Sequence, residues 1–308
     1  MDANRARRCV YASVGAVLTV LSKLSEQDFT RVQGLIFDYA GITLAAGKKQ
    51  LAENRLSRQL RLTTFNDFST YLTAVVKEPA LKQGFISALT TNVTSFYREA
   101  HHFEMLGSTL GRVISQENIT YVPRIWSAGC STGEEAISIL FTVLDSLSEA
   151  HATYLLLKGQ AIVLATDIDT AVLAIAGNAQ YSSAQVKSLP ARWLARAFEK
   201  IDESNYRLRP EFKALIKFHP INLNGPHWLF PTSFGGIRFD AIFCRNVMIY
   251  FNAIVQRNLL LKFLPYLHSN SLFFSGHSEM LLHSSDLFES MGCTAHRPKT
   301  NAYNAHRS

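Results

Sequence analysis

The segment Ser127–Glu135, with the sequence SAGCSTGEE, has the composition of a ligand-binding turn. It follows a short apolar segment and precedes an apolar pattern of helical period, so it is expected to join a strand to a helix. Gly129 and Gly133 allow the backbone to turn tightly and to approach a ligand. Glu134 and Glu135 would repel a phosphate at the helix N-terminus, so the turn favours a ligand with hydroxyl groups or a positive charge.

The same turn also matches G-x-S-x-G, the nucleophile motif of α/β-hydrolases, with Ser131 as the nucleophile. Asp240 and His277 follow in the chain order that such a catalytic triad requires. Against this interpretation, the residues before the turn are mostly helical in pattern and include no Gly-rich oxyanion loop. A serine hydrolase is therefore the less favoured alternative.

Three other polar segments have side chains that could bind a ligand: 166–169 (TDID), 244–251 (CRNVMIYF) and 90–99 (TTNVTSFYRE). In nucleoside-binding sheets, an acidic residue at the end of the second strand accepts hydrogen bonds from ribose hydroxyls, a role open to Asp167. Asp169 is equally suited to cap the helix that follows. The segment 90–99 is unusually polar for a connection between two apolar domains, and is either a capped linker or a strap over a ligand.

Alternating strand and helix patterns are expected to position these segments. Apolar runs predict strands at 124–128, 161–165, 239–244 and 271–275. Helical periodicity predicts helices at 134–147, from 170 onward and at 252–267, the last bent by Pro265. The alternation predicts a mostly parallel, doubly wound α/β sheet, in which ligands bind at the carboxyl ends of the strands.

The chain divides into three parts by pattern. Residues 1–24 are interpreted as an N-terminal extension, and 25–90 as a domain of about four helices, too small for a cofactor site of its own. Ser25 and Asp28 are typical of the first helix's N-terminus. Residues 91–308 form the larger domain, with a small antiparallel β insertion at about 181–220, in which 206–209 and 216–219 alternate like short strands.

Composition and charge restrict the function classes. With 308 residues, 47% hydrophobic and 18% charged, the chain is globular rather than disordered or fibrous. Its four cysteines are far apart and lack zinc-ligand spacing, which predicts reduced thiols, no metal site and a cytoplasmic protein. The net charge of +7 is concentrated in residues 1–90, where twelve Lys and Arg face seven Asp and Glu. Arg55, Arg58 and Arg61 lie along one side of a predicted helix and indicate an acidic partner.

Five segments in this order closely resemble the chemotaxis receptor methyltransferases of the CheR type, from about Leu24 to the C-terminus. They are 91–103 (TNVTSFYREAHHF), 126–135 (WSAGCSTGEE), 165–169 (ATDID), 239–251 (FDAIFCRNVMIYF) and 275–279 (SGHSE). The resemblance implies a Rossmann-like class I S-adenosylmethionine-dependent methyltransferase sheet. It also implies a small N-terminal all-helical recognition domain and a small antiparallel β insertion.

The activity that the resemblance implies is that of a protein-glutamate O-methyltransferase. It would transfer methyl groups from S-adenosylmethionine to glutamates on chemoreceptor cytoplasmic helices, yielding methyl esters and S-adenosylhomocysteine. It needs no metal, no nucleic acid and no membrane-spanning segment, and the chain is expected to be a monomer. In this family the β insertion can dock a receptor C-terminal peptide. Here 199–205 (EKIDESN) lacks the Gly-rich hairpin of many members, so use of such a tether is open.

The resemblance also assigns residues one by one. Arg98 and Tyr250 match positions proposed to act near the transferred methyl group. Arg55, Arg58 and Arg61 are the expected receptor-binding residues, while His101 and His102 are interpreted as structural. The expected cofactor-binding residues are Asn92, Thr94, Arg98, Glu135, Asp167, Asn222, Leu223, Arg245 and Asn246.

This chemistry asks little of the protein beyond orientation. A free glutamate has a pKa of about 4.3, so the nucleophile is already ionised at neutral pH and needs no general base. Arg98 would hold either the substrate carboxylate or that of the cofactor. A degenerate homologue that senses S-adenosylmethionine or binds receptors without turnover is the alternative from a non-enzyme class. A nucleic-acid methyltransferase, suggested by charge alone, is the weakest.

Overall fold

The computed structural model describes residues 23–114, 120–279, 281 and 284–301. The expected N-terminal extension, 1–24, lies almost entirely outside this part of the chain. Among the described residues, no helix combines the length and the apolar character needed to cross a membrane.

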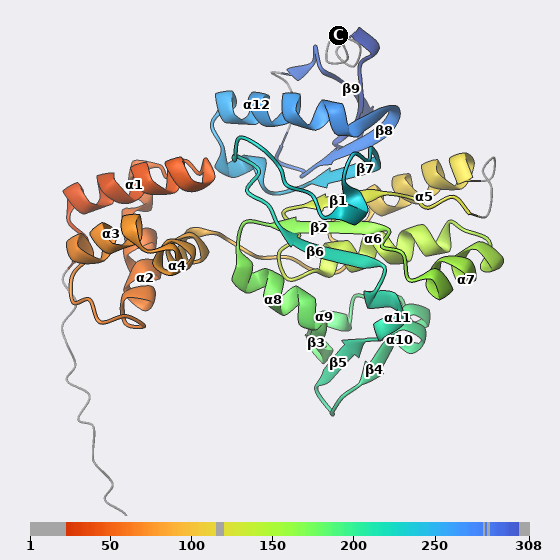
Figure 1. Ribbon diagram of the computed structural model, residues 1–308, viewed down its shortest axis with the longest axis horizontal. Helices are drawn as coiled ribbons and strands as arrows, with labels where there is room; N and C mark the ends of the chain where they lie inside the picture. Colours follow the sequence, from red (N-terminus) through yellow and green to blue (C-terminus); the bar gives the residue numbers. More distant parts are fainter. Residues whose placement is uncertain (1–22, 115–119, 280, 282–283, 302–308) are drawn as a thin grey trace, which may run out of the picture.

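Four α-helices form the N-terminal domain: α1 (Glu26–Ala40), α2 (Lys49–Leu60), α3 (Phe68–Lys77) and α4 (Pro79–Leu89). The Ser25 side chain caps α1 by accepting a hydrogen bond from the Asp28 amide, as the sequence predicts. Gly41 ends α1 with φ at 75°, a conformation that favours glycine. The helices bury one apolar stripe each, and Figure 1 shows them grouped beside the sheet of the larger domain.

The larger domain contains a seven-stranded sheet of order β6-β2-β1-β7-β8-β10-β9. The strands β1, β2, β6, β7 and β8 run parallel, whereas β10 and β9 add an antiparallel C-terminal hairpin. This confirms the predicted α/β fold class. The strand bounds are β1 (Ile125–Ala128), β2 (Val163–Asp167), β6 (Ile216–Pro220), β7 (Phe239–Cys244), β8 (Leu267–Ser275), β9 (Phe288–Gly292) and β10 (Ala295–Pro298).

Helices cover both faces of this sheet and create two hydrophobic cores. In β1, Ile125 belongs to one core and the next residue, Trp126, to the other, as expected when successive side chains point to opposite faces. The Trp126 core also contains the four N-terminal helices and α12 (Ala253–Phe263). The Ile125 core contains α5 (His101–Ile114), α6 (Glu134–Asp145) and α7 (Glu149–Lys158), while α8 (Thr170–Asn178) follows β2.

Two predicted elements differ from the structure. The helix expected over 252–267 ends at Phe263, and Pro265 lies in a 3₁₀ turn, Leu264–Tyr266, directly before β8. Proline has no backbone N–H and its ring clashes with the carbonyl four residues earlier, so the helix ends rather than bends. Residues 216–219, expected in the β insertion, form the parallel edge strand β6 of the main sheet and pair with β2.

The β insertion is a separate three-stranded antiparallel sheet of order β3-β5-β4, comprising β3 (Gln180–Ser182), β4 (Phe198–Lys200) and β5 (Asn205–Leu208). Figure 1 shows it projecting beyond the β6 edge of the main sheet. Between β4 and β5, one Asp202 oxygen accepts hydrogen bonds from the Ser204 amide at 2.8 Å and the Asn205 side chain at 3.0 Å. This Asx-type turn closes the hairpin without glycine. The short helices α9 (Ser183–Val186), α10 (Ala191–Ala197) and α11 (Pro210–Lys213) flank this sheet.

Candidate active site

An open cavity lies at the carboxyl ends of β1, β2 and β7, where the helical domain meets the sheet. Its volume is about 970 Å³ when the open solvent at its mouth is included. Every residue predicted to be catalytic or cofactor-binding lines it: Asn92, Thr94, Arg98, Glu135, Asp167, Asn222, Leu223, Arg245, Asn246 and Tyr250. The structure therefore brings together five segments that are widely separated in the sequence.

The turn after β1 has the backbone geometry that its glycines predict. Gly129 and Gly133 have φ angles of 99° and 96°, and a Cβ atom on Gly129 would lie 2.4 Å from Val247. Ser131 is also left-handed, with φ at 50°, and is fixed from two sides. Its amide donates to Asp167 at 2.9 Å, and its hydroxyl donates to the carbonyl of Asn92 at 2.8 Å.

Two carboxylates give the cavity its acidic character. Glu135 accepts hydrogen bonds from Ser127 at 2.6 Å and Arg245 at 3.1 Å, and Asp167 accepts from the amides of Ser131 and Asp169. Burial raises the pKa of both side chains, because the charged form is poorly solvated there. Glu134 instead accepts from Thr132 and Gln185 away from the cavity. Glu135 and Asp167 therefore suit a ligand that donates hydrogen bonds from an ammonium or hydroxyl group.

The linker between the domains places Arg98 between two residues of unusual backbone conformation. Its neighbours Tyr97 and Glu99 have φ angles of 53° and 58°, which non-glycine residues seldom adopt. The Arg98 side chain is exposed, lines the cavity and donates to the carbonyl of Val93 at 2.9 Å. A cation is thus available at the cavity wall.

Arg245 stabilises this linker through contacts with Glu99 and with the backbone of Arg98. Only 1% of its side chain is exposed, and its guanidinium lies 3.2 Å from Glu99 and 3.1 Å from Glu135. It also donates to the carbonyl oxygen of Arg98. These contacts join the linker, the turn after β1 and the end of β7. Arg245 lines the cavity as predicted, but the recorded contacts of its guanidinium are with the protein.

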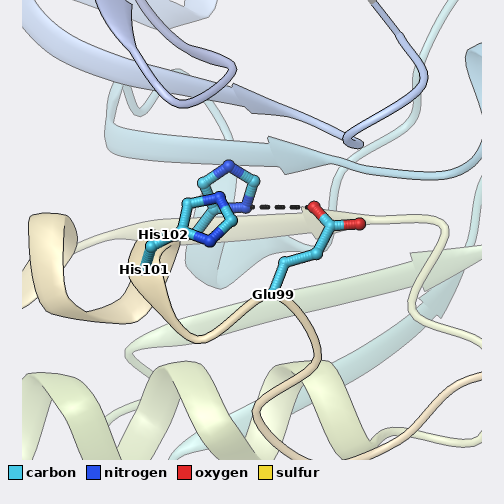
Figure 2. Close-up of side chains that lie close together, drawn as sticks. All are labelled: Glu99, His101 and His102. Atoms are coloured by element: carbon cyan, nitrogen blue, oxygen red, sulfur yellow. Dashed lines mark ion pairs between the residues drawn. The ribbon is translucent and has the colours of Figure 1, made fainter.

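A second group of side chains lies next to this network. Figure 2 shows His101, His102 and Glu99 close together, with 3.5 Å between His102 Nδ1 and a Glu99 oxygen. The same Glu99 oxygen already pairs with the Arg245 cation. His102 Nε2 donates to the carbonyl of Cys293 at 2.7 Å, which fixes the start of α5 to the turn between β9 and β10. Burial and the Arg245 charge lower the pKa of His102 to about 4, so it is neutral at physiological pH and fits the structural role expected for it.

Glu279, for which the sequence predicted no role, holds the loop after β7. Asn246 has φ at 58°, and its amide donates to Glu279 at 2.9 Å. The Ile249 amide donates to the other Glu279 oxygen at 3.0 Å. Tyr250 follows at once, and its carbonyl accepts from the Thr43 amide at 2.8 Å. Glu279 belongs to the SGHSE segment quoted above, which is the signal that could have identified it.

One wall of the cavity comes from the helical domain, which was expected to be too small for a cofactor site of its own. Ala40, Ile42 and Leu89 line the cavity, and the Asn222 side chain donates to the carbonyl of Tyr39 at 2.7 Å. Apolar wall residues have the same sequence signature as core residues, so no pattern distinguishes them. Only the packing of the two domains reveals them.

The two arginines of α2, Arg55 and Arg58, and Arg61 directly after it differ in their surroundings. Arg58 and Arg61 are exposed, whereas Arg55 is half-buried. Arg55 donates to the carbonyls of Leu89 and Thr90 and to the hydroxyl of Thr91. The predicted row of basic side chains therefore has one member directed at the linker.

The hydrolase triad is not assembled. Ser131 lies beyond the carboxyl end of β1, whereas Asp240 lies at the start of β7, beside Arg124, which precedes β1. Asp240 accepts hydrogen bonds from Tyr121 at 2.5 Å and from the Arg124 amide at 2.7 Å. Because β1 and β7 are parallel, Ser131 and Asp240 occupy opposite ends of the sheet.

Comparison with known proteins agrees with this geometry. Residues 92–297 match the model of the CheR methyltransferase SAM-binding domain, and residues 27–90 match that of the CheR all-alpha domain. Chemotaxis protein methyltransferase 2 of Pseudomonas aeruginosa is 38% identical, with 89% of this chain and 94% of that protein aligned. The chemotaxis protein methyltransferases of Escherichia coli and Klebsiella aerogenes are 38% and 40% identical, covering 94% and 83% of this chain and 96% and 84% of their own lengths.

Proposed function

The chain belongs to the CheR family of chemotaxis protein methyltransferases, and from this membership we propose how its residues methylate chemoreceptor glutamates. The observation that carries the proposal is the convergence of ten predicted site residues on one cavity at the carboxyl ends of the parallel strands. In sheets of this type that edge is where ligands bind.

The cavity suits S-adenosylmethionine, which when bound supplies the activated methyl group. Glu135 is placed to hold the cofactor's ammonium group, and Asp167 its ribose hydroxyls. Asn222 and Leu223 would contact the adenine, with Asn92, Thr94 and Asn246 completing the shell. Glycine at position 129 lets the turn after β1 pack against Val247, which also lines the cavity, because a Cβ atom there would lie 2.4 Å from the Val247 side chain. These assignments fit the acidic, hydrogen-bonding character of the walls.

Arg98 and Tyr250 are the residues we assign to the substrate side. The substrate glutamate arrives ionised, so the protein must orient its carboxylate and partly remove its water. Arg98 supplies a cation and Tyr250 a hydroxyl donor at the same cavity. Sharing the carboxylate between two donors limits the strength of any single ion pair, which would otherwise reduce the nucleophilicity of the oxygen.

The receptor is proposed to approach through the basic side of α2. Arg58 and Arg61 are exposed there, and methylation regions with several glutamates would be attracted to them. Because such helices lie in the cytoplasm, we expect the protein to act there. The small β3–β5–β4 sheet is the expected docking place for a receptor C-terminal peptide, where the receptor carries one.

Transfer of labelled methyl groups to receptor-containing membranes tests the proposal. We expect incorporation that mild base releases as methanol, because a methyl ester is base-labile whereas N-methyl products are not. Calorimetric titration with S-adenosylhomocysteine should show binding to the same preparation. Binding without base-labile transfer would instead support the degenerate, cofactor-sensing alternative, and absence of both would contradict the proposal.

A further inference from the structure

Arg55 of α2 is bound to the linker that forms one side of the cofactor cavity. One guanidinium nitrogen, Nη1, donates to the carbonyls of Leu89 at 3.0 Å and Thr90 at 3.1 Å. The other, Nη2, donates to Thr91 Oγ1 at 3.0 Å. Leu89 is the last residue of α4, so the cation lies where unpaired helix carbonyls and the negative end of the helix dipole meet.

The linker residues that Arg55 contacts are themselves attached to the cavity. Leu89, Thr90 and Thr91 all line it. The Thr90 hydroxyl donates to Asp169 at 3.2 Å, and the Asn92 side chain donates to the same Asp169 oxygen at 2.8 Å. Asp169 in turn caps α8, the helix that follows the acidic end of β2.

The series of contacts ends at the turn after β1. The carbonyl of Asn92 accepts the hydroxyl of Ser131, and the Ser131 amide donates to Asp167. Consecutive hydrogen bonds therefore connect Arg55, on the helix proposed to meet the receptor, with Asp167, which also lines the cofactor cavity. Arg58, one turn further along α2, is exposed.

We infer that Arg55 is a positioning residue that fixes the linker for cofactor binding, and that the receptor-binding role of α2 falls to its exposed arginines. A bidentate guanidinium suits two carbonyls and a hydroxyl arranged around one helix end, and charge-assisted hydrogen bonds are stronger than neutral ones. The arrangement also couples the two binding events, since a receptor that shifts α2 would shift the linker. This inference rests on the proposed use of S-adenosylmethionine at the cavity.

The test compares Arg55→Ala with Arg58→Ala, a matched change on the same helix, in the full-length chain. Affinity for S-adenosylhomocysteine is measured by calorimetry, and KM values for S-adenosylmethionine and for receptor membranes are measured separately. For Arg55→Ala we expect the dissociation constant and the cofactor KM to rise about five- to tenfold, the lower part of the range for coupled sites. Arg58→Ala should leave both values unchanged and raise only the receptor KM.

Arg55→Lys is the control for a general folding defect. Lysine keeps the charge and can reach the carbonyls, but it lacks the second nitrogen that donates to Thr91. Partial recovery of cofactor affinity in Arg55→Lys, at a melting temperature equal to that of Arg55→Ala, supports positioning. Cofactor affinity within twofold of the wild-type value in Arg55→Ala, with a raised receptor KM, would overturn the inference and return Arg55 to the receptor-binding surface. Failure of the wild-type protein to bind S-adenosylhomocysteine would instead contradict the proposed function.

Discussion

The carboxylate of Glu279 accepts a hydrogen bond from the backbone amide of Asn246 at 2.9 Å, across 33 positions of sequence. Asn246 is in the left-handed region and lines the cofactor cavity. The same carboxylate accepts the amides of Ile249 at 3.0 Å and Gly276 at 2.5 Å. A single buried acid thus fixes the loop that leads to Tyr250.

Replacing Glu279 by Gln should reduce methyl transfer about tenfold, the lower end of the loss seen when a residue that orients a metal ligand is replaced. The glutamine NH₂ would face backbone N–H groups, so one of the donors now satisfied would lose its acceptor. The free energy of unfolding should fall by about 2 kcal/mol. Turnover numbers and urea unfolding measure both effects.

His277→Ala is the matched control for this prediction, because His277 lies in the same turn but is exposed. It should retain wild-type turnover and stability. Equal turnover in Glu279→Gln and wild type would show that the loop is held by other contacts.

Arg98→Ala should reduce turnover about 100-fold, the scale of loss when a reacting group is no longer held in its productive position. The fold should be unaffected, because the Arg98 side chain is exposed and its one hydrogen bond within the linker is to the Val93 carbonyl. Single-turnover methylation at saturating cofactor is the measurement. Near-normal methylation by this variant would remove Arg98 from the reacting centre. A large rise in cofactor KM with normal single-turnover rates would assign it to the cofactor carboxylate.

Charge reversal of the exposed arginines should act on the receptor alone. In Arg58→Glu with Arg61→Glu, we expect a several-fold higher receptor KM at low salt and a weaker dependence of methylation on ionic strength. Initial rates at several salt concentrations test this. An unchanged receptor KM would mean that this side of α2 is only a solvated basic surface.

The stability of the protein should decrease as the pH falls from about 6.5 to about 4. Burial lowers the pKa of both His102 and His296 to about 4, below their ordinary value of 6.5. Within this window the unfolded histidines bind protons that the folded ones do not, so each contributes a slope of about 1.4 kcal/mol per pH unit. Urea unfolding at several pH values measures the slope.

Histidine variants separate this effect from that of the buried carboxyls Glu135 and Asp167. Because the pKa values of these carboxyls are raised, they change the free energy of unfolding with pH in the opposite direction. His102→Gln and His296→Gln should each remove about one proton from the uptake on unfolding. A slope that neither variant changes would mean that the two histidines titrate alike in both states.

The local features of this protein follow from neighbouring residues. The Ser25 cap, the left-handed Gly129 and Gly133 and the strand Phe239–Cys244 match their predictions, because capping, backbone sterics and side-chain alternation depend on residues close in sequence. The cavity residues were also predicted, since a resemblance spread over five segments marks positions that a shared fold brings together.

Contacts between distant elements depended on the tertiary structure. The alternating sequence of Ile216–Pro220 is compatible with a strand in either the seven-stranded or the three-stranded sheet. Only its pairing with β2 places it in the seven-stranded sheet. Arg55 and Arg58 have the same residue type and neighbouring positions on α2, yet the packing of α2 against α4 directs Arg55 at the carbonyls of Leu89 and Thr90. Helical periodicity defines which residues share a face, whereas the partner of that face is set by how the helices pack.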